Sequence, residues 1–167
     1  KIKLDDSDYE DPLYGKTYLP RKFKVGFAMP PLNDTDVLTN CLGFIAIMKD
    51  GKLAGYNLTA GGGMGMTHNN AKTYPRVADV IGFFTPEHIE AVAKSVLTVH
   101  RDFGDRGDRR HARLKYVLAE RGVEWFRGEV EERAGIMLEE ARMFDFERQG
   151  DLFGWHEAAN GLWFLGL

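Results

Sequence analysis

Residues 43–63 read GFIAIMKDGKLAGYNLTAGGG, and this stretch decides the expected fold. It contains two apolar runs, 43–49 and 53–60, which are separated by Asp50-Gly51. An Asp-Gly pair between such runs is a strong hairpin signal, because the tight turn that joins antiparallel strands requires positive φ angles. The stretch then ends in a glycine triplet, which lets the backbone approach a bulky ligand where a Cβ would clash. The sequence therefore predicts a hairpin that leads either into a ligand-binding loop or into a plain connecting loop.

Further elements are predicted on both sides of this hairpin. They are a strand over 22–28, a short helix over 33–40, a helix that starts at Thr85-Pro86-Glu87, helices over 108–121 and 123–133, and a second hairpin over 155–165. The order of a strand, a hairpin and then helices predicts an α+β fold, in which helices pack on one face of a mixed β-sheet. A doubly wound parallel fold is disfavoured, because strands and helices do not alternate along the chain.

The composition is that of an ordinary globular domain. The 167 residues are 44% hydrophobic and 28% charged, which is enough apolar material for one domain with a core. No apolar run approaches the roughly 20 residues of a membrane span, and the N-terminus lacks the apolar core of a signal peptide, so we expect a cytoplasmic protein with no membrane partner. The net charge of -3 gives no general attraction to nucleic acid. Cys41 stands alone, which excludes an internal disulfide and a CxxC-type metal site.

Two basic segments flank the hairpin. The segment LPRKFK at 19–24 alternates, so that Lys22 and Lys24 share one face of the predicted strand and Phe23 the other. The segment RDFGDRGDRRHARLKY at 101–116 is rich in arginine around the predicted start of a helix. Each pattern alone is typical of a solvated surface. Together with the glycine loop they supply clustered cations and a cradle without side chains, which suits a large polyanionic ligand.

These three segments, in this order, resemble the sulfite and nitrite reductase haemoprotein family, whose members hold sirohaem beside an iron-sulfur cluster. The resemblance runs from DPLYG at 11–15 to GWHE at 154–157. It is greatest to the first large repeated domain of assimilatory, ferredoxin-type sulfite reductases. It implies the large-domain fold of that family, with a linker over 1–15, a sirohaem-binding domain over 16–149, and the start of a ferredoxin-like half-domain over 150–167. The chain is then expected to be a piece of a longer polypeptide.

The resemblance implies roles for particular residues. Lys22 and Lys24 match the family's lysines that line the distal face of sirohaem and bind the substrate anion, so they are the expected catalytic residues. The expected cofactor-binding residues are Asn40, Gly61, Gly62, Gly63, Met64, Thr67, His68, Arg106 and Arg109. His68 is not expected to bind the iron, because the family's proximal ligand is a cysteine of the cluster. No metal ligand is expected in this chain, since the family's four cluster cysteines lie in its second repeat.

The implied function is a part in the six-electron reduction of sulfite to sulfide. The implied cofactors are sirohaem and a 4Fe-4S cluster whose ligands lie outside this chain. The implied partners are sulfite or nitrite, a ferredoxin or flavoprotein electron donor, and the remainder of the parent chain, without which the piece is expected to be inactive. Reduction of nitrite to ammonia stays open as an alternative. A scaffold repeat without catalysis is disfavoured by the presence of Lys22, Lys24 and Arg109, and an RNA-binding module by the negative net charge.

Overall fold

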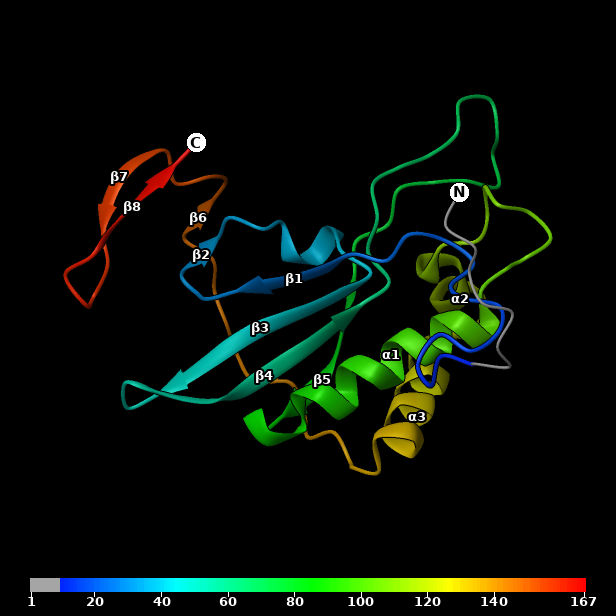
Figure 1. Cartoon of the computed structure of the whole chain (residues 1–167), viewed down its shortest axis with the longest axis horizontal. Coiled ribbons are helices and arrows are strands. Elements are labelled where there is room, and N and C mark those ends of the chain that lie inside the picture. Colours follow the sequence, from blue (N-terminus) through cyan, green and yellow to red (C-terminus); the bar gives the residue numbers. More distant parts are fainter. Residues whose placement is uncertain (1–9) are drawn as a thin grey trace.

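The computed structural model of the protein describes residues 10–167, and its centre is a four-stranded mixed β-sheet (Figure 1). The strands are β1 (Val25–Ala28), β3 (Leu42–Lys49), β4 (Lys52–Ala60) and β5 (Asp79–Phe84), in the spatial order β1-β3-β4-β5. β1 runs parallel to β3, whereas the other neighbours are antiparallel. Most of the predicted linker, residues 1–9, lies outside the described part of the chain.

β3 and β4 form the hairpin that the Asp-Gly pair predicts. Asp50 and Gly51 have φ angles of 52° and 72°, as a tight turn between antiparallel strands requires. β4 ends at Ala60, opposite Leu42 at the start of β3, and the glycine triplet follows directly. The turn therefore fixes the register of the sheet and also the place where the glycine loop begins.

Three helices pack on one face of the sheet, which confirms the predicted α+β class (Figure 1). They are α1 (Ile89–Phe103), α2 (Leu114–Arg121) and α3 (Val123–Ala134), and the 3-10 turn η2 (Pro86–His88) precedes α1. The contact is an apolar cluster that joins Phe44, Leu58 and Ile81 of the sheet to Val92, Val96 and Val99 of α1 and to Leu118, Phe126 and Val130 of the other helices. The spacing within α1 places one apolar stripe on the sheet.

The opposite face of the sheet is covered without a long helix. Ala28 and Ile45 form a second buried cluster there with Val37 of the 3-10 turn η1 (Val37–Thr39), and Phe144 and Phe146 pack on it. Beside it, β2 (Leu32–Asn33) and β6 (Arg148–Gln149) pair in parallel. The sheet is thus buried on both faces, and only the helical face was predicted.

Two predicted elements are shorter in the structure. The strand predicted to start at residue 22 begins at Val25, and the short helix predicted over 33–40 is reduced to the three-residue turn η1. The side-chain oxygen of Asn33 accepts a hydrogen bond from the Val37 N–H (2.9 Å), while Asp36 adopts a left-handed φ of 47°. A side chain that bonds the local backbone, followed by a left-handed residue, favours a single turn over a helix.

The second predicted helix begins late, at Leu114 instead of residue 108. The Asp105 carboxylate accepts hydrogen bonds from the N–H groups of Gly107 (2.7 Å) and Asp108 (3.0 Å). Such side-chain turns compete with helical hydrogen bonds, so the chain stays in a loop until they end. The arginines that precede α2 therefore lie on a loop, although residues 108–113 were predicted to be helical.

Of the remaining elements, β5 was not predicted, whereas the end of α3 and the C-terminal hairpin are confirmed. No strand was predicted at β5, because a short apolar run fits a buried helix as well as a strand. α3 ends before Gly135, which has a φ of 67°, as predicted. The C-terminal hairpin forms from β7 (Gly154–Glu157) and β8 (Trp163–Gly166), a separate two-stranded sheet that projects from the body in Figure 1. Within the described residues, no helix is long and apolar enough to cross a membrane.

Candidate anion-binding site

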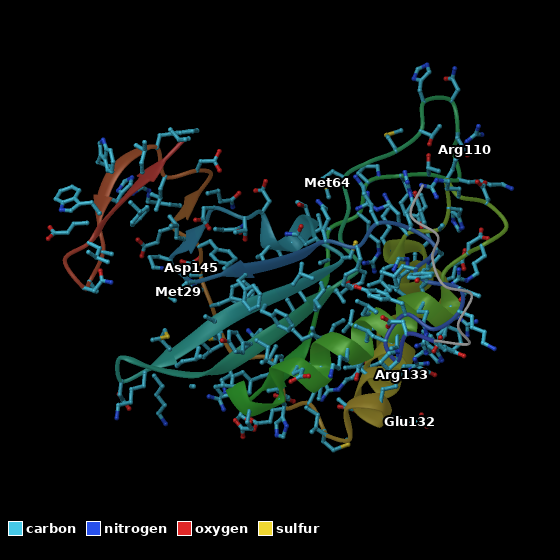
Figure 2. All side chains as sticks on the ribbon, viewed as in Figure 1. Met29, Met64, Arg110, Glu132, Arg133 and Asp145 are labelled. Atoms are coloured by element: carbon cyan, nitrogen blue, oxygen red, sulfur yellow. The ribbon has the colours of Figure 1, made fainter. Side chains whose placement is uncertain are left out.

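A cleft of about 530 Å³ lies where the segment before β1, the loop after β4 and the loop before α2 meet. Its cationic lining residues are Arg21, Lys22, Arg109, Arg110 and Arg113. Asp108 is the only acidic residue of this lining. Figure 2 labels Met64 and Arg110 on two of the segments that surround the cleft. The cleft is thus strongly positive in a chain whose net charge is -3, so it attracts anions locally.

A second, smaller cleft of about 330 Å³ adjoins the first, because Arg21, Lys22 and Arg109 line both. Tyr14 and Tyr18 form part of its wall, and their rings stack with 6.1 Å between centroids. Two of the predicted site residues, Lys22 and Arg109, therefore lie where the two clefts meet.

Lys22 and Lys24 are both exposed, as their alternation with Phe23 predicts. Phe23 packs inward, and its ring stacks on the His100 ring with 5.6 Å between centroids. The segment is extended before β1 begins, and the Lys24 carbonyl accepts a hydrogen bond from the Leu42 N–H (3.1 Å). Lys22 lines the cleft and Lys24 does not, so the structure brings one of the two predicted catalytic lysines to the cleft wall.

His100 is buried beneath this segment and ties α1 to the loop before α2. Its Nε2–H donates a hydrogen bond to the Ala112 carbonyl (2.9 Å), and its buried Nδ1 has no partner in residues 10–167. Burial lowers the pKa of His100, and the hydrogen bond to Ala112 opposes this shift only in part. The charges of Arg106 and Arg113 lower the pKa further. His100 is therefore a neutral support for both sides of the cleft at pH 7.

The glycine triplet is buried against the protein itself. A Cβ at Gly62 would lie 2.4 Å from the Leu38 carbonyl oxygen. A Cβ at Gly63 would lie 2.6 Å from the Arg113 guanidinium, and Gly61 has a left-handed φ of 81°. The close approach that these glycines permit is thus to the protein's own chain, and their expected contact with a ligand stays a prediction. The exposed part of the loop begins directly after the triplet.

The loop after β4 reaches the cleft through residues 65–67. Thr67 lines the cleft, as predicted for a binding residue, and its N–H donates a hydrogen bond to the Thr73 hydroxyl (2.8 Å). Met64 and His68 are exposed on the same loop but lie outside the cleft lining. The structure therefore brings only part of the predicted GGGMGMTH motif to the cleft.

Asn40 and Arg106 are engaged elsewhere and do not line the cleft. The Asn40 side-chain amide donates to the carbonyls of Thr35 (3.1 Å) and Asp36 (3.2 Å), which closes the turn around η1. The Arg106 guanidinium donates to backbone carbonyls, including that of Tyr18 (2.6 Å), and holds the N-terminal segment. These side chains satisfy backbone groups of the protein, and their expected contact with a cofactor stays a prediction.

The sequence reasoning missed the two most unusual cations of the site, Arg113 and Lys115. The Nε and Nη2 atoms of Arg113 are buried and have no hydrogen-bond partner within the described chain. Lys115 is fully buried, although it is charged, and its ammonium is bound by backbone carbonyls. A signal was present in the sequence, since Lys115 stands between the apolar residues Leu114 and Tyr116 in a segment expected to pack on the core.

Metal ligands are scarce in the described part of the chain. Within residues 10–167 no group of three or more His, Cys, Asp or Glu side chains is placed to hold a metal ion. Cys41, the one cysteine of the sequence, is buried. The cationic side chains that line the two clefts offer anion binding.

Residues 3–138 match the family described as the nitrite and sulphite reductase 4Fe-4S domain. The chain belongs to this family. The match includes the four-stranded sheet, all three helices and every residue that lines the two clefts, and it ends before β6. The resemblance inferred from the three basic and glycine-rich segments is thus confirmed.

Members of the nitrite and sulphite reductase family with high similarity are much longer than this chain. The sulfite reductase (NADPH) hemoprotein beta-component of Myxococcus xanthus is 59% identical over 158 residues, and that of Geobacillus kaustophilus is 53% identical over the same length. Both alignments cover 95% of the chain and 28% of the relative. The solved structure of the Mycobacterium tuberculosis NirA protein matches with a TM-score of 0.72 and 28% identity, over 87% of this chain and 26% of NirA. The chain therefore spans little more than a quarter of these proteins.

Proposed function

We propose that this chain is the sirohaem-binding part of a sulfite reductase that converts sulfite to sulfide. The observation that carries the proposal is the cationic cleft, whose Arg113 guanidinium has two buried nitrogen atoms without partners in the described chain. The names of the relatives support it, because proteins called sulfite reductase hemoprotein align with 95% of the chain. The activity is that of the longer protein, since the chain spans 28% of those relatives.

The residues present fit a carboxylate-rich macrocycle. Sirohaem carries eight carboxylates, and guanidinium groups bind carboxylates through paired hydrogen bonds. A buried charged donor without a partner costs at least about 1 to 3 kcal/mol, which a bound carboxylate at Arg113 would remove. Arg109 lines both clefts and takes part in no ion pair of the described chain, so it is assigned a second carboxylate. The exposed backbone at Gly65 adds a wall without a side chain, where a flat ring can approach closely.

The chain's own residues supply substrate binding and protons. Sirohaem, when bound with its cluster, supplies the electrons. Sulfite is a small dianion, and Lys22 at the cleft wall binds it as a compact, rotatable charge. Each S–O bond that breaks releases its oxygen as water, so the ammonium groups of Lys22 and Lys24 donate protons to the departing oxygens. Arg109 and Arg113 orient the ring by its carboxylates.

The iron-sulfur cluster is assigned to the remainder of the longer protein. One buried cysteine, Cys41, cannot supply four thiolate ligands. The proposed domain division is a linker over 1–15, the sirohaem-binding domain over 16–149, and the start of a following half-domain over 150–167. The projecting hairpin of β7 and β8 supports that division, because it forms a sheet of its own and exposes Trp155 and Trp163.

The electron donor proposed is a partner component that uses NADPH. The names of the relatives specify NADPH and a beta-component, whereas the sequence resemblance alone favoured a ferredoxin-type enzyme. An NADPH-linked donor supports a cytoplasmic location. Nitrite reduction to ammonia is the second candidate, because the family name includes nitrite and the ammonium of Lys22 at the cleft wall suits either anion.

The test uses the full-length protein that contains this chain. Purified protein is expected to show the absorbance of sirohaem and to form sulfide from sulfite with a chemical reductant as the electron source. A parallel assay with nitrite decides between the substrates through the ratio of the two kcat/KM values. A purified protein without sirohaem, or one that forms no sulfide, contradicts the proposal.

A further inference from the structure

The loop between β4 and β5 projects far from the sheet but is narrow at its base (Figure 1). At the base, Gly63 and Arg76 pair through two backbone hydrogen bonds, with N···O distances of 2.8 and 3.0 Å. We call residues 63–76 the binding loop, because its residues 65–67 form one wall of the cationic cleft. The other backbone hydrogen bonds described within the binding loop join residues 67, 70 and 73 near its tip, so side chains hold its limbs to the body.

Lys115 provides the principal side-chain contact to the binding loop. Its ammonium donates hydrogen bonds to the carbonyl oxygens of Gly63 (2.9 Å), Gly65 (2.8 Å) and Tyr74. Gly63 and Gly65 belong to the outgoing limb of the loop and Tyr74 to the returning limb. An ammonium has three N–H donors and no acceptor, so these three carbonyls satisfy it completely. Lys115 therefore joins both limbs from inside the protein, where it is fully buried.

Arg76 binds the preceding carbonyl in the same way. Its Nη1 donates to the Gly61 carbonyl (3.0 Å), and its other terminal nitrogen pairs with Asp79. The carbonyls of residues 61, 63 and 65 are thus all bound by buried or half-buried cations. No hydrogen bond of the described chain uses the N–H groups of residues 64–66, and Gly65 and Met66 line the cleft. The Met66 N–H belongs to the same trans peptide group as the Gly65 carbonyl, so it points away from Lys115, on the side of the cleft that Met66 lines.

Arg113 lies against the same glycines. A Cβ at Gly63 would be 2.6 Å from the Arg113 Nη2, and a Cβ at Gly65 would be 3.3 Å from its Nη1. Arg113, whose guanidinium has two partnerless nitrogen atoms, and Met66, whose N–H has no acceptor in the described chain, both line the cleft. Donors that converge without an acceptor are typical of an anion site, and a carboxylate has two oxygens to share among them.

We propose that Lys115 is a positioning residue for the bound cofactor, because it holds the binding loop so that the Met66 N–H and the Arg113 guanidinium face one carboxylate. This inference rests on the proposed function, since it takes sirohaem as the ligand. Lys115 does not touch the ligand itself. It acts through the backbone of Gly63 and Gly65, and its charge keeps their carbonyl oxygens away from the anion.

The protonation of Lys115 follows from its surroundings. Burial lowers its pKa to about 8, and the nearby charge of Arg113 acts in the same direction. A charge on Cys41, which lies on the sheet side, would raise it. Tyr74 and Tyr116 also face the ammonium, with ring centroids at 5.9 and 4.9 Å, and burial raises the pKa of Tyr116 so that it stays neutral. Above pH 8 a neutral amine has only two N–H donors for three carbonyls and no charge to attract an anion. Because a bound carboxylate favours the charged form of Lys115, sirohaem is expected to bind more weakly as the pH rises through about 8.

The first experiment substitutes Lys115 in the full-length protein. Amides of residues 63–76 in the Lys115→Met variant are expected to exchange hydrogen for deuterium about tenfold faster or more, and sirohaem is expected to dissociate faster by a similar factor. Lys115→Arg keeps a cation and is expected to retain more sirohaem than Lys115→Met. Lys94→Met is the matched control, because Lys94 is exposed and pairs with Glu90 on α1, away from the loop.

The second experiment measures sirohaem retention as a function of pH, first in the unmodified protein. Sirohaem retained after gel filtration is expected to fall between pH 7 and 9.5 in the unmodified protein, and to stay level in Lys115→Arg, whose guanidinium does not lose its proton. Cys41→Ala is expected to keep the wild-type response, which excludes the thiol as its source. If Lys115→Met does not fold, the comparison of the unmodified protein with Lys115→Arg still tests the role of Lys115.

The outcomes separate the two proposals. An unmodified protein that holds no sirohaem overturns the proposed function, and with it the cofactor role of Lys115. Normal sirohaem retention in folded Lys115→Met, with unchanged exchange of the binding loop, overturns the role of Lys115 alone. The same pH profile in the unmodified protein and in Lys115→Arg also overturns it.

Discussion

The arginines of the outer helices and the cations of the cleft have opposite surroundings, although both groups stand on the same small fold. On α3, Arg133 donates to Asp102 (2.7 Å) and Glu129 (3.0 Å), and Arg127 donates to Glu131 (3.0 Å). Figure 2 shows Arg133 on the helical side, away from Arg110. Within the described residues, no ion pair includes Arg21, Lys22, Arg109, Arg110 or Arg113.

This difference distinguishes charged residues that stabilise the fold from charged residues that bind a ligand. Burial alone would raise the pKa of Asp102, but hydrogen bonds from Arg101 and Arg133 outweigh it and lower the pKa. The helical ion pairs are thus complete without a ligand. The cleft cations repel one another and leave Arg113 partly buried without an acceptor, which lowers stability unless an anion binds. Cations without acidic partners at the cleft, in contrast to the paired charges on the helices, therefore mark the cleft as the binding region.

The strongest test of this distinction removes the cation at the cleft wall. Replacing Lys22 with Met in the full-length protein is expected to reduce sulfite turnover by on the order of 100-fold, because a group that stabilises developing charge contributes about 2 to 4 kcal/mol. Lys24→Met is expected to have a smaller effect, since Lys24 lies outside the cleft lining. The sirohaem spectrum is expected to stay unchanged in both variants, and Lys52→Met at the β3–β4 turn is the control. Full turnover in Lys22→Met returns this lysine to a solvated surface role.

The next largest effect is expected at Arg113. Replacing Arg113 with Met removes a charge-assisted contact to a carboxylate, worth about 1.5 to 3 kcal/mol, so sirohaem retention is expected to fall. The thermal stability of the sirohaem-free protein is expected to hold or rise, because a buried charge without a partner is removed. Absorbance per protein and thermal unfolding measure the two effects. A loss of stability with full sirohaem retention contradicts the assignment of Arg113 to binding.

A pH effect on stability is expected from His100. Burial lowers the folded-state pKa of His100 below its ordinary value of 6.5, so the unfolded chain takes up a proton at a higher pH than the folded chain does. The stability from neutral His100 is complete above pH 6.5 and is lost as the pH falls through the folded-state pKa, at up to about 1.4 kcal/mol per pH unit. The difference in unfolding free energy between wild type and His100→Gln is expected to shrink between pH 7 and pH 5. A constant difference shows that His100 does not titrate in this way.

The smallest effect is expected on the helical side. Replacing Arg133 with Met breaks its ion pairs with Asp102 and Glu129 and is expected to lower the unfolding free energy by about 0.5 to 1 kcal/mol, because half-buried ion pairs at the surface are still screened by water. Sirohaem retention and sulfite turnover are expected to match the wild type. If Arg133→Met loses sirohaem as readily as Arg113→Met, the contrast between the two sets of cations is wrong.

Local sequence signals determined much of the scaffold. The Asp50-Gly51 pair specified the central hairpin, Gly135 ended α3, and the apolar spacing of α1 specified its buried face. These signals work because each depends on the φ angles or the helical spacing of a few neighbouring residues. The three basic and glycine-rich segments were likewise sufficient to identify the family, since their order and composition are distinctive.

Only the tertiary structure decided which charges are satisfied. The sequence shows Lys115 two residues after Arg113, but it does not show that Lys115 meets the carbonyls of Gly63 and Tyr74 while Arg113 meets none. It also does not show that Arg106 binds the Tyr18 carbonyl instead of facing the cleft. The reason is physical: the partners of a charged side chain here lie about 40 to 90 positions away in the sequence, and only the packing of the helices on the sheet brings them within hydrogen-bond distance.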